Sequence, residues 1–238
     1  MPSPLPSVPT CIYAIGDIHG RADLLSQLVE KITADAASLE EAKHIVFLGD
    51  YIDRGPESRT VLDFLIQEIP SGLTPIFLRG NHEDILLRFL AGDESVCKDW
   101  LHYGGRETLA SYGLSAQNFE EMDTEKRRAT LWAHIPQAHL DFLAATQFSY
   151  TSGDYFFAHA GIRPGVPLSQ QTTRDLLWAR HIFIPETRNY EKIIVHGHTI
   201  SIEPDIQFNR IGIDTGAYAS GRLTCLKLHK NTRAFLST

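Results

Sequence analysis

Residues 44–55 read HIVFLGDYIDRG, an apolar run that ends at a glycine and is followed by two aspartates and an arginine. A short apolar run bounded by turn residues predicts a buried strand with a charged loop behind it. The same arrangement recurs on both sides, where GDIHG (16–20) follows CIYAI and GNHE (80–83) follows a strand expected over 74–78. Apolar residues at helical spacing follow each loop, over 23–36, 57–69 and 82–90. Three such units in succession predict a parallel sheet covered by helices.

The rest of the chain changes character twice. Residues 93–146 show helical patterns and are expected to form a helical insertion. Short apolar runs then predict a second, mixed sheet, with strands expected over 155–158, 192–195, 205–208, 211–214 and 223–228. We therefore expect an α/β fold of two mixed sheets flanked by helices. Residues 11–238 are expected to be one catalytic domain, preceded by a flexible proline-rich leader over 1–10.

Composition excludes several classes of protein. The chain has 238 residues, of which 43% are hydrophobic, too many for a disordered protein. Its 22 basic and 29 acidic residues give a net charge of −7, which argues against a nucleic-acid partner. No apolar run approaches the ~20 residues of a membrane span. Three widely spaced cysteines, at positions 11, 97 and 225, indicate free thiols and a reducing, cytoplasmic location.

Polar residues stand at the end of five expected strands. Besides the three loops above, His159 follows YFFA, and His196 and His198 follow KIIV. In open α/β sheets, ligands bind beyond the carboxyl ends of the strands, so these loops are expected to converge. One such residue alone would be read as a cap or turn residue. Five together offer oxygen and nitrogen donors without a thiolate, a set that suits Mn, Fe or Zn and is large enough for two ions.

The motifs GDIHG, GDYIDRG, GNHE, HAG and GHT, in this order, resemble the signature of a known family. They are similar to those of the metal-dependent phosphoprotein phosphatases, the serine/threonine branch of the calcineurin-like metallophosphoesterase superfamily. The compact bacterial and bacteriophage members are the most similar. The motifs span residues 16–199, and IDTGA (213–217) also fits. The resemblance implies the metallophosphoesterase sandwich and hydrolysis of phosphate esters.

The resemblance also implies a dinuclear metal centre held by six side chains. These are Asp17 and His19 at the first metal, Asp50 bridging the two, and Asn81, His159 and His198 at the second. His198 is preferred to His196 because it matches the GHT motif. Mn is the easiest ion to defend, and Fe or Zn would suit the same ligands. A hydroxide shared by the metals would attack phosphorus in line with the leaving oxygen.

Further residues take implied roles in catalysis and substrate binding. His82 would protonate the leaving group as general acid, and Asp53 would orient its imidazole. Arg54 and Arg180 would grip the phosphate, for which the planar guanidinium is well suited, together with Asn81. The expected substrate is a phosphorylated protein, with serine or threonine favoured and tyrosine open, or a small phosphoester. The oligomeric state cannot be read from the residues.

Three other functions were weighed against this one. Symmetrical diadenosine tetraphosphatases share the metal motifs but typically lack the aspartate at the position of Asp53 and read GNHD, where this chain has Glu83. Nuclease and phosphodiesterase relatives commonly have GHxH, whereas Ile200 stands at that second position. A non-catalytic binding protein should have lost a ligand or the acid, and none is lost. The insertion is expected to set specificity, with Tyr103–Arg106 as a candidate substrate-side loop and Trp100 as a packing residue.

Overall fold

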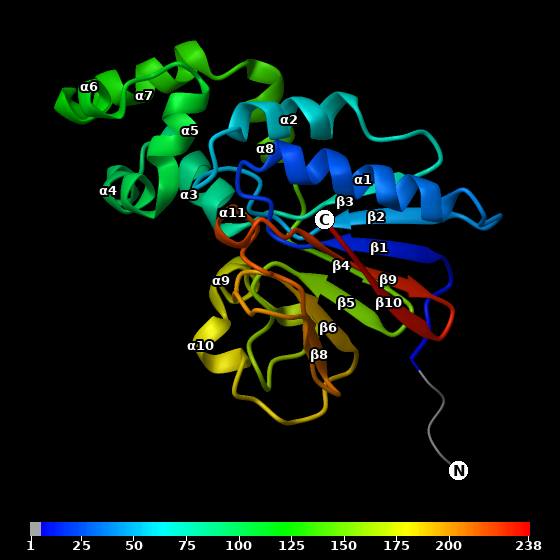
Figure 1. Cartoon of the computed structure of the whole chain (residues 1–238). Coiled ribbons are helices and arrows are strands. Elements are labelled where there is room, and N and C mark those ends of the chain that lie inside the picture. Colours follow the sequence, from blue (N-terminus) through cyan, green and yellow to red (C-terminus); the bar gives the residue numbers. More distant parts are fainter. Residues whose placement is uncertain (1–5) are drawn as a thin grey trace.

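The first sheet carries the strand–loop–helix units. The computed structural model describes residues 6–238, and this sheet has the strand order β10-β9-β1-β2-β3 (Figure 1). Strands β1, β2 and β3 are parallel, as predicted, while β9 runs antiparallel to β1 and β10 antiparallel to β9. The bounds are β1 (Cys11–Ile15), β2 (Lys43–Phe47), β3 (Thr74–Phe77), β9 (Thr224–His229) and β10 (Thr232–Ser237).

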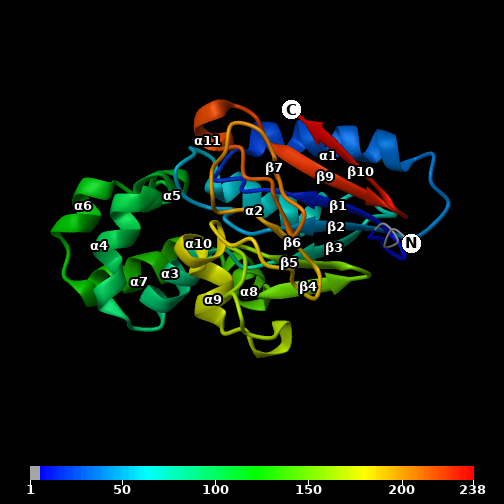
Figure 2. The same ribbon diagram turned by 90° about the horizontal axis from the view of Figure 1, so that it is seen from below.

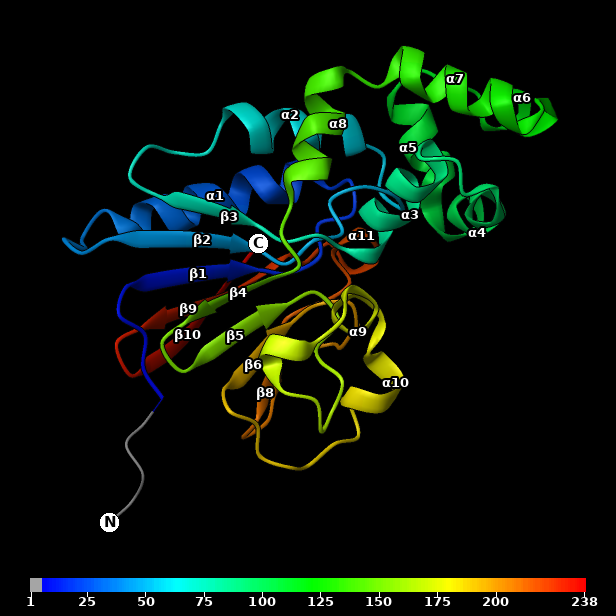
Figure 3. The ribbon, with the colours of Figure 1, turned by 180° about the vertical axis from the view of Figure 1, so that it is seen from behind.

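The second sheet is also mixed, as expected, and has the order β4-β5-β6-β8-β7. The strand expected over 223–228 does not belong to it, because it pairs with β1 as β9 of the first sheet. Its inner strands β5, β6 and β8 are parallel, and β4 and β7 pair antiparallel at the two edges. The bounds are β4 (Ser149–Ser152), β5 (Tyr155–Ala158), β6 (Ile193–His196), β7 (Asp205–Ile206) and β8 (Arg210–Gly212). Each sheet therefore has parallel strands at its centre, and the arrowheads of β1, β2 and β5 point toward the insertion (Figure 3).

Helices cover the outer faces and form the insertion. The three helices that follow β1, β2 and β3 are α1 (Ala22–Ala36), α2 (Ser58–Gln67) and α3 (Asn81–Leu90). The insertion contains α4 (Cys97–Trp100), a π-helical turn (Leu101–Gly105), α5 (Arg106–Ser111), α6 (Ala116–Glu121), α7 (Thr124–His134) and α8 (Gln137–Ala145). Later helices are α9 (Thr173–Trp178), α10 (Arg180–Phe183) and α11 (Ala217–Ser220). Most of the insertion projects to one side of both sheets (Figure 2).

Side-chain alternation along the strands builds a four-layer sandwich. In β1, Ile12 and Ala14 join the apolar layer between the two sheets, whereas Tyr13 and Ile15 face α1 and α2. In β6, Ile194 faces the outer layer with α9 and α10, and the neighbouring Val195 faces the layer between the sheets. Successive strand residues point to opposite faces, so strands buried on both sides read as the continuous apolar runs seen in the sequence.

The structure differs from the expected elements at several points. Edge strands β4 and β10 and the short helices α6, α9 and α10 were not predicted, because they are short or half-exposed and lack a clear apolar period. Within the expected leader, residues 1–5 lie outside the described residues. Ser7 and Val8 are held: Ser7 N donates to Asp154 Oδ2 at 2.8 Å, Val8 N donates to Lys230 O at 3.0 Å, and Val8 is buried. No helix among residues 6–238 is long and apolar enough to cross a membrane.

Candidate dinuclear metal centre and phosphate pocket

Strand-end loops from both sheets meet around Asp50. Its Oδ2 lies 3.3 Å from His19 Nε2 and its Oδ1 lies 3.4 Å from His159 Nε2. Two groups of donors, each with its atoms within 4.8 Å of one another, share this carboxylate: His19, Asp50 and His82, and Asp50, His159 and His198. The first sheet supplies the loops after β1 and β2, and the second supplies those after β5 and β6. Asp50 thus lies where a bridging ligand is expected.

Asp17 and Asn81 complete the ring of donors predicted from the sequence. Both oxygens of Asp17 accept the backbone N–H of His198, at 3.2 and 3.0 Å. Asn81 begins α3, and its Oδ1 lies 2.8 Å from His159 Nε2. The structure therefore brings all six predicted metal-binding residues together, and it also places His82 against Asp50.

His196 lies away from this cluster. It occupies the last position of β6 on the same face as Ile194, so its ring packs against Phe183, with centroids 5.1 Å apart, in the outer layer. His198, two residues on and beyond the strand, turns toward His159, with ring centroids 5.1 Å apart. The end of β6 at His196 and the left-handed backbone of His198, with φ 60°, separate the two histidines that the sequence left as alternatives.

The ring nitrogens are oriented from behind by backbone carbonyls. His19 Nδ1 donates to Ile52 O and His159 Nδ1 donates to Leu48 O, both at 2.9 Å. Burial lowers the pKa of His19 and of His159, so each ring is neutral and its Nε2 carries a lone pair. Those lone pairs face oxygens of Asp50 and Asn81, which are also hydrogen-bond acceptors. No proton is therefore available to form a hydrogen bond between the two atoms. Among the described residues, His19 Nε2 is buried with no hydrogen-bond partner.

Two of the buried carboxylates, Asp17 and Asp214, also lack compensation. Burial, together with Asp214 and Asp50, raises the pKa of Asp17 well above its usual value. Burial likewise raises the pKa of Asp214 to about 6, and burial lowers the pKa of His198 to about 3. Buried carboxylates among neutral imidazoles are costly unless a cation neutralises them. The donor set and the facing lone pairs therefore fit divalent metal ions, with oxygen and nitrogen ligands suited to Mn, Fe or Zn.

Backbone strain is concentrated at the same place. Non-glycine residues in the left-handed region number six among the described residues, and Lys230 alone lies outside the site. Such conformations cost about 1–3 kcal/mol each and persist where surrounding contacts determine them. The five at the site, with φ between 46° and 72°, are His19, Asp50, Asp53, Arg54 and His198.

Glu83 braces the loop that carries Asp50. Its carboxylate is fully buried and accepts the backbone N–H groups of Asp50 and Tyr51, both at 2.8 Å, and those of Ile52 at 3.2 Å and Gly80 at 2.9 Å. The sequence analysis used Glu83 only to separate related families and gave it no structural role. Four backbone donors on one buried carboxylate fix the loop in its strained conformation.

His82 and Asp53 form a tight pair beside the donor cluster. His82 Nδ1 donates to Asp53 Oδ2 at 2.7 Å, and Asp53 is completely buried. Burial opposes a charged ring, but Asp50 and the bond to Asp53 outweigh it and raise the pKa of His82 above its usual value. Arg54 Nη2 lies 3.2 Å from His82 Nε2, and the Arg54 guanidinium packs over the Tyr218 ring at 5.0 Å. The sequence analysis did not identify Tyr218.

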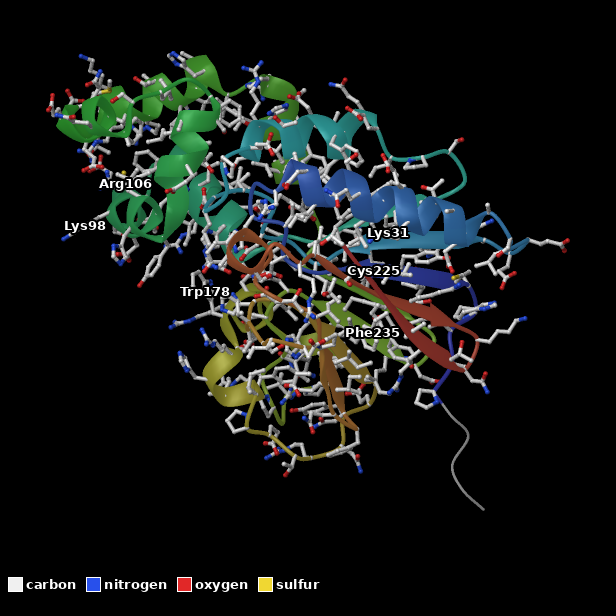
Figure 4. All side chains as sticks on the ribbon, viewed as in Figure 1. Lys31, Lys98, Arg106, Trp178, Cys225 and Phe235 are labelled. Carbon is white, nitrogen blue, oxygen red and sulfur yellow. The ribbon has the colours of Figure 1, made fainter. Side chains whose placement is uncertain are left out.

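A pocket of about 940 Å³ opens beside this pair. Its lining joins His198 and Arg54 from the strand-end loops to residues of the insertion, and exposed Arg180 also lies on its wall. Lys98 and Arg106 come from the insertion, and both lie above Trp178 of α9 in the view of Figure 4. The pocket is thus basic in a chain of net charge −7: its Arg and Lys residues are Arg54, Lys98, Arg106, Arg127 and Arg180, against Glu107 and Glu120.

The comparisons with known proteins agree with this geometry. A model of the family described as calcineurin-like phosphoesterase matches residues 12–228. The chain belongs to this family. A bis(5'-nucleosyl)-tetraphosphatase PrpE (asymmetrical) from Anoxybacillus flavithermus is 28% identical over 232 residues, covering 90% of this chain and 88% of the relative. The protein of the same name from Bacillus anthracis is also 28% identical over the same shares.

Solved structures show the same calcineurin-like fold in proteins with different described activities. A chain provisionally described as a diadenosine tetraphosphatase matches with TM-score 0.63 and 19% identity, covering 98% of this chain and 96% of that one. A cold-active protein-tyrosine phosphatase from a psychrophilic Shewanella matches with TM-score 0.60 and 19% identity, covering 95% and 80%. A protein serine/threonine phosphatase from Saccharomyces cerevisiae gives 0.55 and 15%, covering 96% and 79%. This phosphoesterase fold therefore does not by itself choose the substrate.

Proposed function

We propose that this calcineurin-like phosphoesterase is a metal-dependent phosphomonoesterase whose substrates have a poor leaving group, in the first place phosphoserine and phosphothreonine in proteins. The observation that carries the proposal is the His82–Asp53 pair, with Nδ1 and Oδ2 2.7 Å apart in a buried setting. An alkoxide leaves slowly unless it is protonated as the P–O bond breaks, so a general acid is most useful against serine and threonine esters. A nucleotide leaves as a phosphate, which needs a proton far less.

Asp50 and the five donors around it are proposed to hold two divalent ions, with Asp17 and His19 at one, Asn81, His159 and His198 at the other, and Asp50 shared by both. Ions bound there would neutralise charge on the phosphate and make water nucleophilic at neutral pH. The protein's own contribution is to keep the imidazoles neutral, through burial and the carbonyl bonds on Nδ1, and to hold Asp50 between the two groups. Mn is proposed for activity in vitro.

Arg54 and Arg180 are proposed to grip the phosphate oxygens from the pocket, and Asn81, which lies beside His159, is proposed to contribute from the donor cluster. Arg54 is placed to do so because its side chain reaches His82 Nε2 and is backed by Tyr218. A guanidinium offers two parallel N–H donors to a phosphate, which fixes the orientation of the ester as well as its position. His82 Nε2 would then face the leaving oxygen.

Hydrolysis of dinucleoside tetraphosphates is the second candidate, and two observations favour it. The pocket presents basic side chains well beyond those near Asp50, as a chain of several phosphates would require. The curated relatives, which match this chain over most of their own length, are named bis(5'-nucleosyl)-tetraphosphatases. The names of these relatives specify the asymmetrical enzyme, whereas the alternative considered from the sequence motifs is the symmetrical one. For this second candidate we therefore propose asymmetrical cleavage.

One assay separates the two candidates. Phosphate release from phosphoserine, phosphothreonine and phosphotyrosine peptides would be measured with Mn, beside nucleotide release from diadenosine tetraphosphate, with EDTA as the blank. Higher kcat/KM on the serine or threonine peptides supports the first candidate. Faster release of ATP and AMP from the dinucleotide overturns it in favour of the second. No turnover of any substrate in metal-loaded protein overturns both and leaves a binding protein on this fold.

A further inference from the structure

The Asp53 carboxylate is held on all sides. Besides the bond from His82, its Oδ1 accepts the Thr108 hydroxyl at 2.6 Å, and the Trp100 indole N–H lies 3.2 and 3.1 Å from its two oxygens. The backbone N–H of Asp53 lies 3.0 Å from Ser58 Oγ and 2.9 Å from Thr108 Oγ1. All of these groups are buried. A carboxylate held in this way has one orientation available to it.

Two of these partners come from the helical insertion. Trp100 ends α4 and Thr108 lies in α5, and both are buried within a segment that otherwise projects away from the sheets (Figure 1). The π-helical turn between them makes a third contact with the same loop, because Gly104 O accepts the backbone N–H of Arg54 at 3.1 Å. The insertion therefore touches the loop of Asp53 and Arg54 at three points along 100–108.

We propose that the insertion is part of the catalytic apparatus, with Trp100 and Thr108 as positioning residues that fix Asp53 and, through it, the acid His82. The inference rests on the proposed function, since it concerns the acid that protonates the leaving group. Removing either donor frees the carboxylate to rotate, and the imidazole then loses the single orientation in which Nε2 meets the leaving oxygen. Trp100, expected from the sequence only to pack, then has a polar role as well.

Variants of Trp100 and Thr108 should lose kcat by an amount that depends on the leaving group of the substrate. Trp100→Phe removes the N–H and keeps most of the packing, and Thr108→Val removes the hydroxyl at nearly constant volume. Ser58 still accepts the Asp53 N–H in the second variant. General acid catalysis contributes about 10²–10⁴-fold, so we expect the double variant to lose roughly 10- to 100-fold in kcat on a phosphoserine peptide. On p-nitrophenyl phosphate, whose leaving group needs no proton, the loss should be under about threefold.

Matched variants control for general damage to the insertion. Trp132→Phe and Thr130→Val make the same substitutions on α7, where Trp132 is exposed, and should leave both rates unchanged. Thr108→Ser keeps the hydroxyl and should restore most of the peptide rate lost in Thr108→Val. Thermal unfolding of each variant confirms that the rates belong to folded protein, and the single variants stand in should the double one not fold.

The outcomes separate this inference from the proposed function. Suppose that the wild-type protein hydrolyses the peptide, and that the variants lose kcat equally on both substrates or on neither. This result overturns the positioning role and leaves the proposed function intact. If Thr108→Ser is as slow as Thr108→Val on the peptide, the Thr108 hydroxyl does not position Asp53. Wild-type protein that hydrolyses neither ester in Mn overturns the proposed function and the inference with it.

Discussion

The strand-end loops and the helical insertion contribute to the site in opposite ways. The loops are buried, strained and charged: Asp50, at φ 52°, is 1% exposed and stands between two groups of metal donors. The insertion consists of α-helices of 4 to 11 residues, and at the site it bonds Asp53 through Trp100 and Thr108 and the backbone N–H of Arg54 through Gly104 O. The loops place groups that would meet metals and phosphate, whereas the insertion places groups that hold them. Damage to the first should abolish turnover, and damage to the second should make turnover selective among substrates.

Replacing Asp50 is expected to have the largest effect. Asp50→Asn removes the one carboxylate shared by both donor groups, so metal binding should fail together with catalysis. A lost metal costs several kcal/mol of transition-state stabilisation, which corresponds to roughly 10³-fold or more in rate. Metal content by elemental analysis and kcat in Mn would be measured together, with Asp84→Asn, a partly buried carboxylate on α3, as control. Two ions per chain and a rate within tenfold of wild type would contradict the assignment.

Asp53→Asn should rank second and should discriminate among substrates. The amide no longer holds the charged form of His82, so protonation of an alkoxide suffers by about 10²-fold. Hydrolysis of p-nitrophenyl phosphate should change much less, because its leaving group needs no acid. The chain offers a matched control in Asp63→Asn, since Asp63 Oδ1 lies 3.0 Å from His139 Nε2 in a second histidine–carboxylate pair remote from the pocket. Equal losses on both substrates would argue against His82 as the acid.

The difference between the two regions also explains what the sequence could reveal. The loops were predicted because each follows an apolar strand directly, so a local pattern places its residues in space. The family resemblance, and not this pattern, selected the six metal-binding candidates among them. The partners of Asp53 could not be found this way. Trp100 and Thr108 meet it from 47 and 55 residues along the chain, and nothing in their neighbourhoods marks them as polar contacts.

Other gaps in the sequence analysis have the same local origin. β10 reads TRAFLS and lies at the sheet edge with every residue half-buried or exposed, so no alternation of polar and apolar residues marks it. The choice between His196 and His198 rested on a motif. Alternation alone does not decide it, because both histidines are in phase with Ile194. His196 is still part of β6 and faces the outer layer, whereas His198 lies beyond the end of the strand with φ 60°, and strand boundaries are what sequence patterns fix least well.

Gly104 lies where the insertion touches the loops, and its replacement should have a smaller effect. It has φ 120°, and a Cβ there would lie 2.5 Å from Arg54 N. Gly104→Ala should therefore displace Arg54, raising KM for the phosphoserine peptide by roughly tenfold through a weaker phosphate grip. Gly113→Ala is the control, because Gly113 also has a positive φ, at 78°, but has open space around it. It measures the effect of backbone strain without a steric clash. A KM unchanged in Gly104→Ala, or raised equally in both, would mean that the contact does not position Arg54.

The smallest predicted effect is a pH-dependent loss of stability caused by His196 at the end of β6. Burial lowers the pKa of His196 to about 4, and among the described residues its Nε2 has no hydrogen-bond partner. The unfolded chain binds a proton near its ordinary pKa of about 6.5, so below that pH the unfolded state holds more protons and stability falls, down to about pH 4. Between pH 7 and 5.5 this contributes about 1 kcal/mol of lost unfolding free energy.

His196→Asn should remove that loss, because its amide can donate to Gly197 O in place of Nδ1 and does not titrate. Denaturant unfolding in saturating Mn, at pH 7 and at pH 5.5, would measure it, with the exposed His134→Asn on α7 as the matched control. A metal ion at the donor cluster would not remove the destabilisation caused by His196, because His196 faces the outer layer and not the cluster. If His196→Asn instead abolished metal binding, His196 would belong to the metal centre, and its placement in the outer layer would be wrong.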